Sequence, residues 1–90
     1  MAKAQADPAE LMQFARSLTR FNRGLEELTG GLKAQLRRLE SSWHDQEQQQ
    51  FAESFNQMTK TLTRFVEQSD EHARVLAKKA QHLDNYLKQR

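Results

Sequence analysis

The sequence predicts a chain reversal at Glu40-Ser41-Ser42-Trp43-His44-Asp45-Gln46-Glu47, close to the midpoint of its 90 residues. This segment holds the only tryptophan and interrupts a helical pattern of apolar residues, which runs from Leu11 to Leu39 and resumes from Phe51 to Leu87. Two helical patterns separated by a short polar segment are typical of a helical hairpin. We therefore expect an all-α fold, an antiparallel hairpin of two long helices with its turn at Ser41-Asp45.

Local signals mark the start of both helices. Asp7-Pro8-Ala9-Glu10 supplies an N-cap residue, a proline at the first helical position and an acid at the third. At the turn, Ser42 followed three residues later by Asp45 resembles a capping box with Ser42 as the cap, and Trp43 is expected to seal the end of the hairpin. We predict a single helical-hairpin domain over 7–90, with helices at 7–41 and 46–88, a turn at 42–45 and a flexible N-terminus at 1–6.

The first helix carries one apolar row and one weak point. The row, spaced by three and four residues, is Leu11, Phe14, Leu18, Phe21, Leu25, Leu28 and Leu32. Gly30-Gly31 lies inside it, and each glycine costs roughly 1 kcal/mol relative to alanine in a helix. The pair predicts either a kink or break, or a smooth side that another backbone approaches. Because Leu28 and Leu32 stay in register across it, we favour a continuous helix.

The second helix has more apolar side chains than one partner helix can cover. Its row is Phe51, Phe55, Met58, Leu62, Phe65, Ser69, His72 or Ala73, Leu76, Ala80, Leu83 and Leu87. A hairpin buries one stripe per helix, and the five phenylalanines of the chain exceed such a seam. We therefore expect dimerisation into a four-helix bundle. The predicted dimer or partner interface is Phe14, Leu18, Phe21, Leu25, Phe55, Met58, Leu62 and Phe65.

The end of the second helix is predicted to extend beyond the first. Pairing the helices about Trp43 places Leu76 near Leu11, so residues past about Ala80 have nothing in their own chain to pack against. An overhanging apolar segment indicates either fraying or contact with another subunit. The candidate residues for tail recognition are Leu83, Tyr86 and Leu87.

Composition and motifs exclude several classes of function. Fourteen Lys and Arg against twelve Asp and Glu give a net charge of +2, which does not favour nucleic-acid binding. The sequence has no cysteine and no apolar run long enough for a membrane span. No signal-peptide h-region follows Met1, so we expect no classical signal peptide. No catalytic or cofactor-binding motif is present. We therefore predict no catalytic residue, no cofactor and no enzyme; an acid-base role for His44 and Asp45 is a distant alternative.

The three histidines do not form a metal site. His72 and His82 are ten residues apart on a helix and do not share a face at metal-ligand spacing. His44 beside Asp45 and Glu47 has the residue types of a metal or acid-base cluster, but a solvated corner with a helix cap is the preferred interpretation, because adjacent residues at a helix start point in different directions. His72 lies near the apolar row of the second helix, which favours a polar position that sets helix register over a pH sensor, although a histidine at an interface can be either.

The length, the hairpin and the Ser42-Trp43-His44-Asp45 corner resemble the WXG-motif superfamily of early-secreted-antigen-like proteins. The turn motif comprises Trp43, Asp45 and Phe51, with Asp45 where that family has glycine. Tyr86 is not followed four residues later by the family's acid, because that position is Arg90. The resemblance implies the same hairpin fold and a non-enzymatic protein that dimerises through its helices.

The resemblance also implies a role in type VII secretion. The protein would be secreted without a classical signal peptide, or would escort an exported partner. Its partners would be a second hairpin, in a homodimer or a heterodimer, and a secretion ATPase. The alternative is a cytoplasmic helical adaptor or export chaperone that receives a partner helix in a groove.

Overall fold

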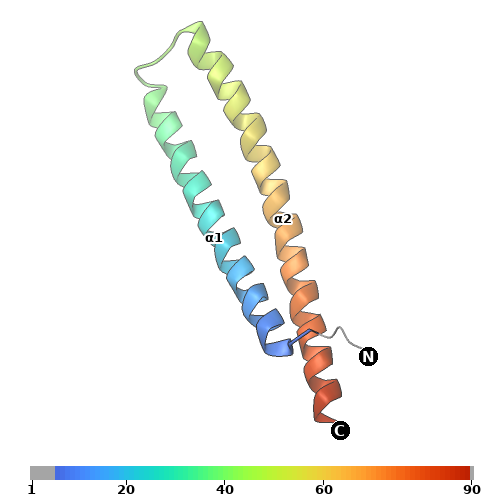
Figure 1. Ribbon diagram of the computed structural model, residues 1–90. Helices are drawn as coiled ribbons and strands as arrows, with labels where there is room; N and C mark the ends of the chain where they lie inside the picture. Colours follow the sequence, from blue (N-terminus) through green and yellow to red (C-terminus); the bar gives the residue numbers. More distant parts are fainter. Residues whose placement is uncertain (1–5, 90) are drawn as a thin grey trace.

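The computed structural model describes residues 6–89 as an antiparallel helical hairpin (Figure 1). Helix α1 spans Pro8–Leu39 and helix α2 spans Gln46–Lys88. They lie side by side in a rod of 68 × 19 × 14 Å. The described residues contain no strand, so the predicted all-α hairpin is confirmed. Of the N-terminus predicted to be flexible at 1–6, residues 1–5 lie outside the described part.

Helix α1 begins with the cap that its sequence predicts and ends earlier than expected. Asp7 Oδ1 accepts a hydrogen bond of 2.9 Å from the amide of Ala9. At the other end, the amides of Ser42 and Trp43 both donate to the carbonyl of Leu39 at 3.0 Å. These short-range bonds satisfy a carbonyl at the helix end and tighten the chain into the turn. The helix therefore ends at Leu39, two residues before the predicted boundary at 41.

Asp45, not Ser42, caps α2. The Asp45 carboxylate accepts from the amide of Gln48 at 2.9 Å, and its backbone is extended, as an N-cap requires. The Ser42 hydroxyl instead donates to the carbonyl of Leu39 at 3.3 Å. The predicted capping box with Ser42 as the cap was therefore wrong. Ser42 hydrogen-bonds to the last residue of α1, and the carboxylate of Asp45, three residues later, is the N-cap of α2.

The glycines of α1 leave the helix continuous. The helix runs without interruption through Gly24, Gly30 and Gly31, and none of them has a positive φ. The predicted continuous helix is confirmed, and the alternative of a break at Gly30-Gly31 is wrong. A Cβ atom added at any of the three would meet nothing within 4 Å. Helix α2 therefore does not use these positions for a close approach.

Nine buried residues form the seam between the two helices, and most of them are small or polar. The seam comprises Ala15, Asn22, Gln48, Phe55, Thr59, Val66, Ser69, Ala73 and Ala80. On α2 it follows steps of three, four or seven residues, from Gln48 through Phe55 and Thr59 to Ala80, which keep one face of the helix towards α1. The predicted row of α2 was therefore partly wrong: Phe51, Met58 and Phe65 are exposed on the neighbouring stripe. The larger side chains turn outward while smaller ones meet α1.

Helix α2 extends beyond the start of α1 (Figure 1). The overhanging segment begins about one helical turn further along α2 than predicted. Pro8 and Met12 lie in a shared hollow with Ala80 and Asp84, so the first turn of α1 reaches that far along α2. Leu83, expected to have nothing to pack against, is half-buried. Tyr86 and Leu87 lie past this contact and are 64% and 49% exposed.

Candidate interaction face

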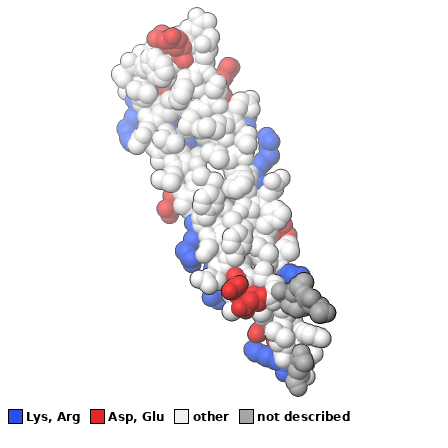
Figure 2. Space-filling model, in the orientation of Figure 1, with Lys and Arg blue, Asp and Glu red and all other residues white. Residues whose placement is uncertain are grey.

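The most prominent surface feature is an exposed face made of large apolar side chains from both helices. We call this the apolar face and define it by nine residues: Phe14, Phe21, Leu28, Leu32 and Leu39 of α1, and Phe51, Met58, Phe65 and Val75 of α2. Each is between 45% and 71% exposed. Figure 2 shows one face of the hairpin on which most charged side chains lie along the edges, with an acidic cluster within the face near its lower end.

Heptad spacing aligns these side chains. Phe14, Phe21 and Leu28 follow one another at seven-residue intervals, and seven residues make nearly two helical turns, so the three lie in one row. Phe51 and Phe65 lie in the corresponding row of α2, with Met58 between them. The two rows meet where the rings of Phe21 and Phe65 pack edge to face, with centroids 6.4 Å apart at 84°. The apolar face is thus continuous across both helices.

A groove of about 440 Å³ lies in this face towards the open end of the hairpin. The residues that line it are Phe14, Leu18, Phe65, Gln68, Ser69, His72, Val75 and Leu76. His72 is the only ionisable side chain among them. The groove is a shallow apolar depression that suits a side chain or helix of a protein partner.

The turn end carries a ladder of aromatic rings. Trp43 packs against Phe51 with ring centroids 6.1 Å apart, and Phe51 stacks on Phe55 at 6.0 Å. Trp43 is partly exposed, and Phe51 is exposed on the apolar face. The tryptophan therefore extends the aromatic surface to the hairpin tip, while Phe55 anchors that surface in the seam.

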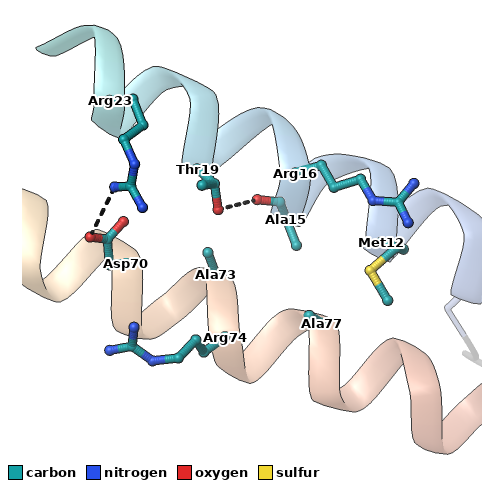
Figure 3. A pocket seen from close by; sticks show the side chains of 9 residues that line it. All are labelled: Met12, Ala15, Arg16, Thr19, Arg23, Asp70, Ala73, Arg74 and Ala77. Carbon is teal, nitrogen blue, oxygen red and sulfur yellow. Dashed lines mark hydrogen bonds and ion pairs between the residues drawn. The ribbon is translucent and has the colours of Figure 1, made fainter.

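The side of the hairpin opposite the apolar face is polar. On this side, the Asn22 side chain of α1 makes a contact across the seam with α2. This side chain is fully buried and donates from Nδ2 to Oδ1 of Asp70 at 2.8 Å. Arg23 reaches the other oxygen of Asp70 at 3.7 Å (Figure 3). One turn further on, the side-chain hydrogen bond with Glu71 raises the pKa of Arg74 above its ordinary value. The contacts of Asp70 with Asn22 and Arg23 tie α1 to α2 in one register.

Figure 3 shows a shallow pocket of about 290 Å³ on the polar side, with a floor of small side chains. Its lining comprises Met12, Ala15, Arg16, Thr19, Arg23, Asp70, Ala73, Arg74 and Ala77. Thr19 donates to the carbonyl of Ala15 at 3.1 Å, within α1. Arg16 extends away from Arg23, so the guanidinium groups do not converge on one point (Figure 3). The pocket is a gap above the alanines of the seam.

The residues predicted from the sequence to form the interface fall into three groups in the structure: exposed on the apolar face, half-buried at its edge, or buried in the seam. Phe14, Phe21, Met58 and Phe65 lie on the apolar face. Leu18, Leu25 and Leu62 are half-buried at its edge, while Phe55 is buried in the seam and was wrongly counted as available to a partner.

Sequence reasoning also missed part of the candidate site. It did not assign Leu28, Leu32, Leu39 or Val75 to the interface, and it placed Phe51 only in the turn motif. Leu28 is nevertheless the most exposed of the nine at 71%. The heptad interval from Phe21 was the available signal for Leu28. Asn22 was missed as well, because a polar residue gives no sign of burial in an apolar pattern.

Within residues 6–89, no group of three or more His, Asp or Glu side chains is arranged to hold a metal ion. Neither helix in the same range is long and apolar enough to cross a membrane.

Comparison with known families identifies the hairpin. The sequence model of the family described as "Proteins of 100 residues with WXG" matches residues 3–86. This chain belongs to the WXG100 family. The resemblance carried by the corner around Trp43 is therefore confirmed, and the chain is a small helical protein of a family associated with type VII secretion. In this WXG100 chain, Asp45 occupies the family's glycine position and caps α2.

A solved structure supports the WXG100 fold. The hairpin is similar to the crystal structure of a secreted protein, ESXB, from Bacillus anthracis str. Sterne, with a TM-score of 0.81. The two chains are 20% identical, and the match covers 96% of this chain and 98% of that chain. A search of curated proteins found no match.

Proposed function

We propose that this WXG100 protein is a non-enzymatic component of a type VII-like secretion system, exported itself or escorting an exported partner. It acts by pairing its apolar face with a second hairpin to form a four-helix bundle. The observation that carries the proposal is the apolar face, whose large side chains are each 45% to 71% exposed in the hairpin.

The size of this face matches what a stable interface needs. Nine apolar side chains that are each about half exposed present on the order of 800 Å², which is one partner's share of a standard protein interface. Contiguous apolar patches on stable monomers rarely exceed a few hundred Å². Covering the apolar face is therefore expected to contribute a large part of the stability of the folded protein.

The chemistry of the face favours a second copy of the same chain. None of its nine residues is charged, so a partner must offer an equally long and uncharged surface to avoid burying an unpaired charge. The chain's own apolar face meets this requirement. A two-fold pair would place the same face on both sides of the interface, as symmetric dimers do. A heterodimer with a related hairpin is the other outcome of the test.

The two ends of the hairpin remain accessible in such a bundle. Trp43 marks the turn end and is partly exposed, and Tyr86 and Leu87 project from the overhanging end of α2. We assign these ends to recognition by the secretion machinery, with the secretion ATPase as the candidate receptor. Export would then need no classical signal peptide.

The first test is the solution mass of the purified chain over a dilution series. Light scattering should give about 21 kDa, twice the 10.5 kDa of the chain, with dissociation at low concentration. A folded monomer at every concentration would contradict self-association. A chain that folds only when a second hairpin is added would identify the heterodimer.

Export needs a separate test in a host that has the secretion system. The chain and a Tyr86→Ala, Leu87→Ala variant would be expressed together with the system's ATPase, and the culture medium assayed for each. We expect the unchanged chain in the medium and the variant retained in the cell. A matched control, Lys88→Ala, changes a neighbouring exposed residue and should be exported. Equal export of all three would contradict tail recognition.

A cytoplasmic adaptor or export chaperone is the second candidate function, and the 440 Å³ groove favours it. A partner helix could lay apolar anchors between Phe14 and Leu76 in the helix-in-groove manner. A gene for a secretion ATPase beside this gene would favour the first function. A folded monomer that stays in the cell and binds a defined helical peptide would favour the second.

A further inference from the structure

Met58 is the one methionine of the apolar face, and its side chain is 47% exposed in the hairpin. It stands midway in a row of α2 whose other members, seven residues to either side, are Phe51 and Phe65. These two rings are 48% and 45% exposed, so the thioether lies inside the row of large apolar side chains. A partner that covers the row therefore also covers the sulfur atom of Met58.

A second methionine offers a comparison on the other side of the hairpin. Met12 is half-buried and lines the pocket on the polar side (Figure 3), so it does not belong to the apolar face. Met1 lies outside the described residues. The described residues thus hold one thioether on the proposed interface and one thioether away from it.

The composition of the chain directs peroxide towards methionine. The sequence has no cysteine, so no thiolate competes for the oxidant. Hydrogen peroxide transfers one oxygen atom to a thioether: a sulfur–oxygen bond forms as the O–O bond of the peroxide breaks. The sulfur loses two electrons, and the peroxide is reduced to water. The product, methionine sulfoxide, is polar where the thioether was apolar.

We propose that Met58 is an oxidation site that controls the pairing of two apolar faces. A peroxide converts Met58 to the sulfoxide in the separated hairpin, and the oxidised hairpin then pairs weakly. This inference rests on the proposed function, because it takes a second copy of the chain as the partner that covers Met58. Each bundle then contains two copies of this sulfur atom.

The physical cause is the loss of hydrogen bonds from water. A buried sulfoxide oxygen needs a donor, and none of the nine side chains of the apolar face carries one. The hydroxyl groups one helical turn away are those of Ser54 and Thr61, and Thr61 already donates to the carbonyl of Gln57 at 3.2 Å. In the separated hairpin, water supplies the donors instead. Oxidation therefore favours separation.

Pairing and oxidation oppose each other in both directions. In the bundle Met58 is covered and shielded from peroxide, whereas the pocket that Met12 lines lies on the side that stays open. Oxidation of Met58 should therefore be slow where the bundle prevails and faster on dilution, while oxidation of Met12 proceeds equally in both. Each sulfoxide should weaken association about tenfold, so the two in a bundle should raise the dissociation constant about a hundredfold.

The first part of the test follows the rate of oxidation. The full chain is treated with hydrogen peroxide at two protein concentrations, one above and one below its dissociation constant. Peptide mass spectrometry measures the oxygen gained at each methionine. We expect dilution to speed the oxidation of Met58 several-fold and to leave that of Met12 unchanged.

The second part measures the dissociation constant by sedimentation equilibrium before and after oxidation, with circular dichroism to monitor helix content. Met58→Leu keeps an apolar side chain without sulfur and should associate equally well before and after peroxide. Met12→Leu is the matched control and should weaken as the unchanged chain does. Methionine sulfoxide reductase with a dithiol, which becomes a disulfide as the oxygen leaves as water, should restore association.

The outcomes distinguish this inference from the proposed function. A dimer whose dissociation constant stays the same once Met58 is fully oxidised overturns the inference and leaves the proposed function standing. Weakening that persists in Met58→Leu, or disappears in Met12→Leu, overturns the assignment to Met58. Equal oxidation rates of Met58 at both concentrations overturn its burial in the bundle, and the inference with it. Monomers at every concentration before oxidation overturn both proposals.

Discussion

The seam between the helices and the apolar face beside it have opposite compositions. The seam is built mainly from small or polar residues such as Ala15, Ser69 and Ala73, whereas the apolar face carries Phe14, Phe21 and other large side chains. In most single domains the largest apolar residues lie inside. The difference supports the proposal that the hairpin is half of a core, in which case folding and association would be linked.

The contrast also explains how two helices of this length can form so thin a rod. Alanine and serine allow the helices to lie close together and leave little apolar volume between them. Full burial of a large apolar side chain contributes about 1.5–3 kcal/mol relative to full exposure, so covering one that is about half exposed contributes about half as much. The apolar face therefore has more stabilisation to offer than the seam, but only when a partner covers it.

A charge placed at the centre of the apolar face should have the largest effect. We expect Phe21→Asp to weaken self-association by at least about a thousandfold, because it removes the contact with Phe65 and would bury an unpaired carboxylate. Light scattering measures the change. The matched control is Gln57→Asp, which adds the same charge to an exposed position of α2 half a turn from the seam. Equal association of both variants would show that the apolar face is not the interface.

Loss of the polar contact inside the seam should have the next largest effect. Asp70→Ala leaves the fully buried Nδ2 of Asn22 without its acceptor, which should cost about 1–3 kcal/mol in the free energy of unfolding. Urea denaturation measures it. Glu71→Ala removes an exposed carboxylate that pairs with Arg74 and should cost less than about 1 kcal/mol. Similar losses for the two variants would mean that Asn22 finds another partner.

The cap of α2 should have a smaller effect that depends on the replacement. Asp45→Ala removes the acceptor of the Gln48 amide and should cost about 1 kcal/mol, whereas Asp45→Gly should cost only a few tenths because glycine is tolerated at this position. Ser42→Ala should change stability by less than about 0.5 kcal/mol, since Ser42 does not cap α2. Thermal unfolding distinguishes the three. A larger loss for Ser42→Ala than for Asp45→Ala would restore the serine as the cap.

Local sequence signals predicted the ends and class of the fold better than the orientation of its faces. The Asp7-Pro8 start and the reversal near Trp43 depend on neighbouring residues, so the sequence identifies them directly. Which stripe of α2 meets α1 depends instead on packing between distant residues. Phe55 and Met58 are equally apolar in sequence and three residues apart, yet only Phe55 enters the seam. The spacing of apolar residues identifies a stripe on a helix, but it does not show which of two neighbouring stripes packs against the other helix.

The candidate site shows the same limit. Four of the residues predicted to contact a partner, among them Phe21 and Phe65, lie on the apolar face. They were predicted to do so because the chain has more large rings than a two-helix seam can cover. Their role as an interface stays a prediction. Asn22 could not be found in this way, since its burial depends on Asp70, which lies 48 residues away. Its place in the seam follows from the register of the two helices, which no local pattern encodes.

The smallest expected effect tests whether anything approaches α1 closely on the side of its glycines. Gly31→Ala should stabilise the protein by about 0.5–1 kcal/mol, because alanine favours the helix and a Cβ atom there meets nothing within the chain. Gly24→Ala, one heptad earlier in the same row, should behave alike. Thermal unfolding at several protein concentrations measures both. If Gly31→Ala instead weakens association while leaving helix content unchanged, then a partner's backbone packs against this side, and the interface extends beyond the apolar face.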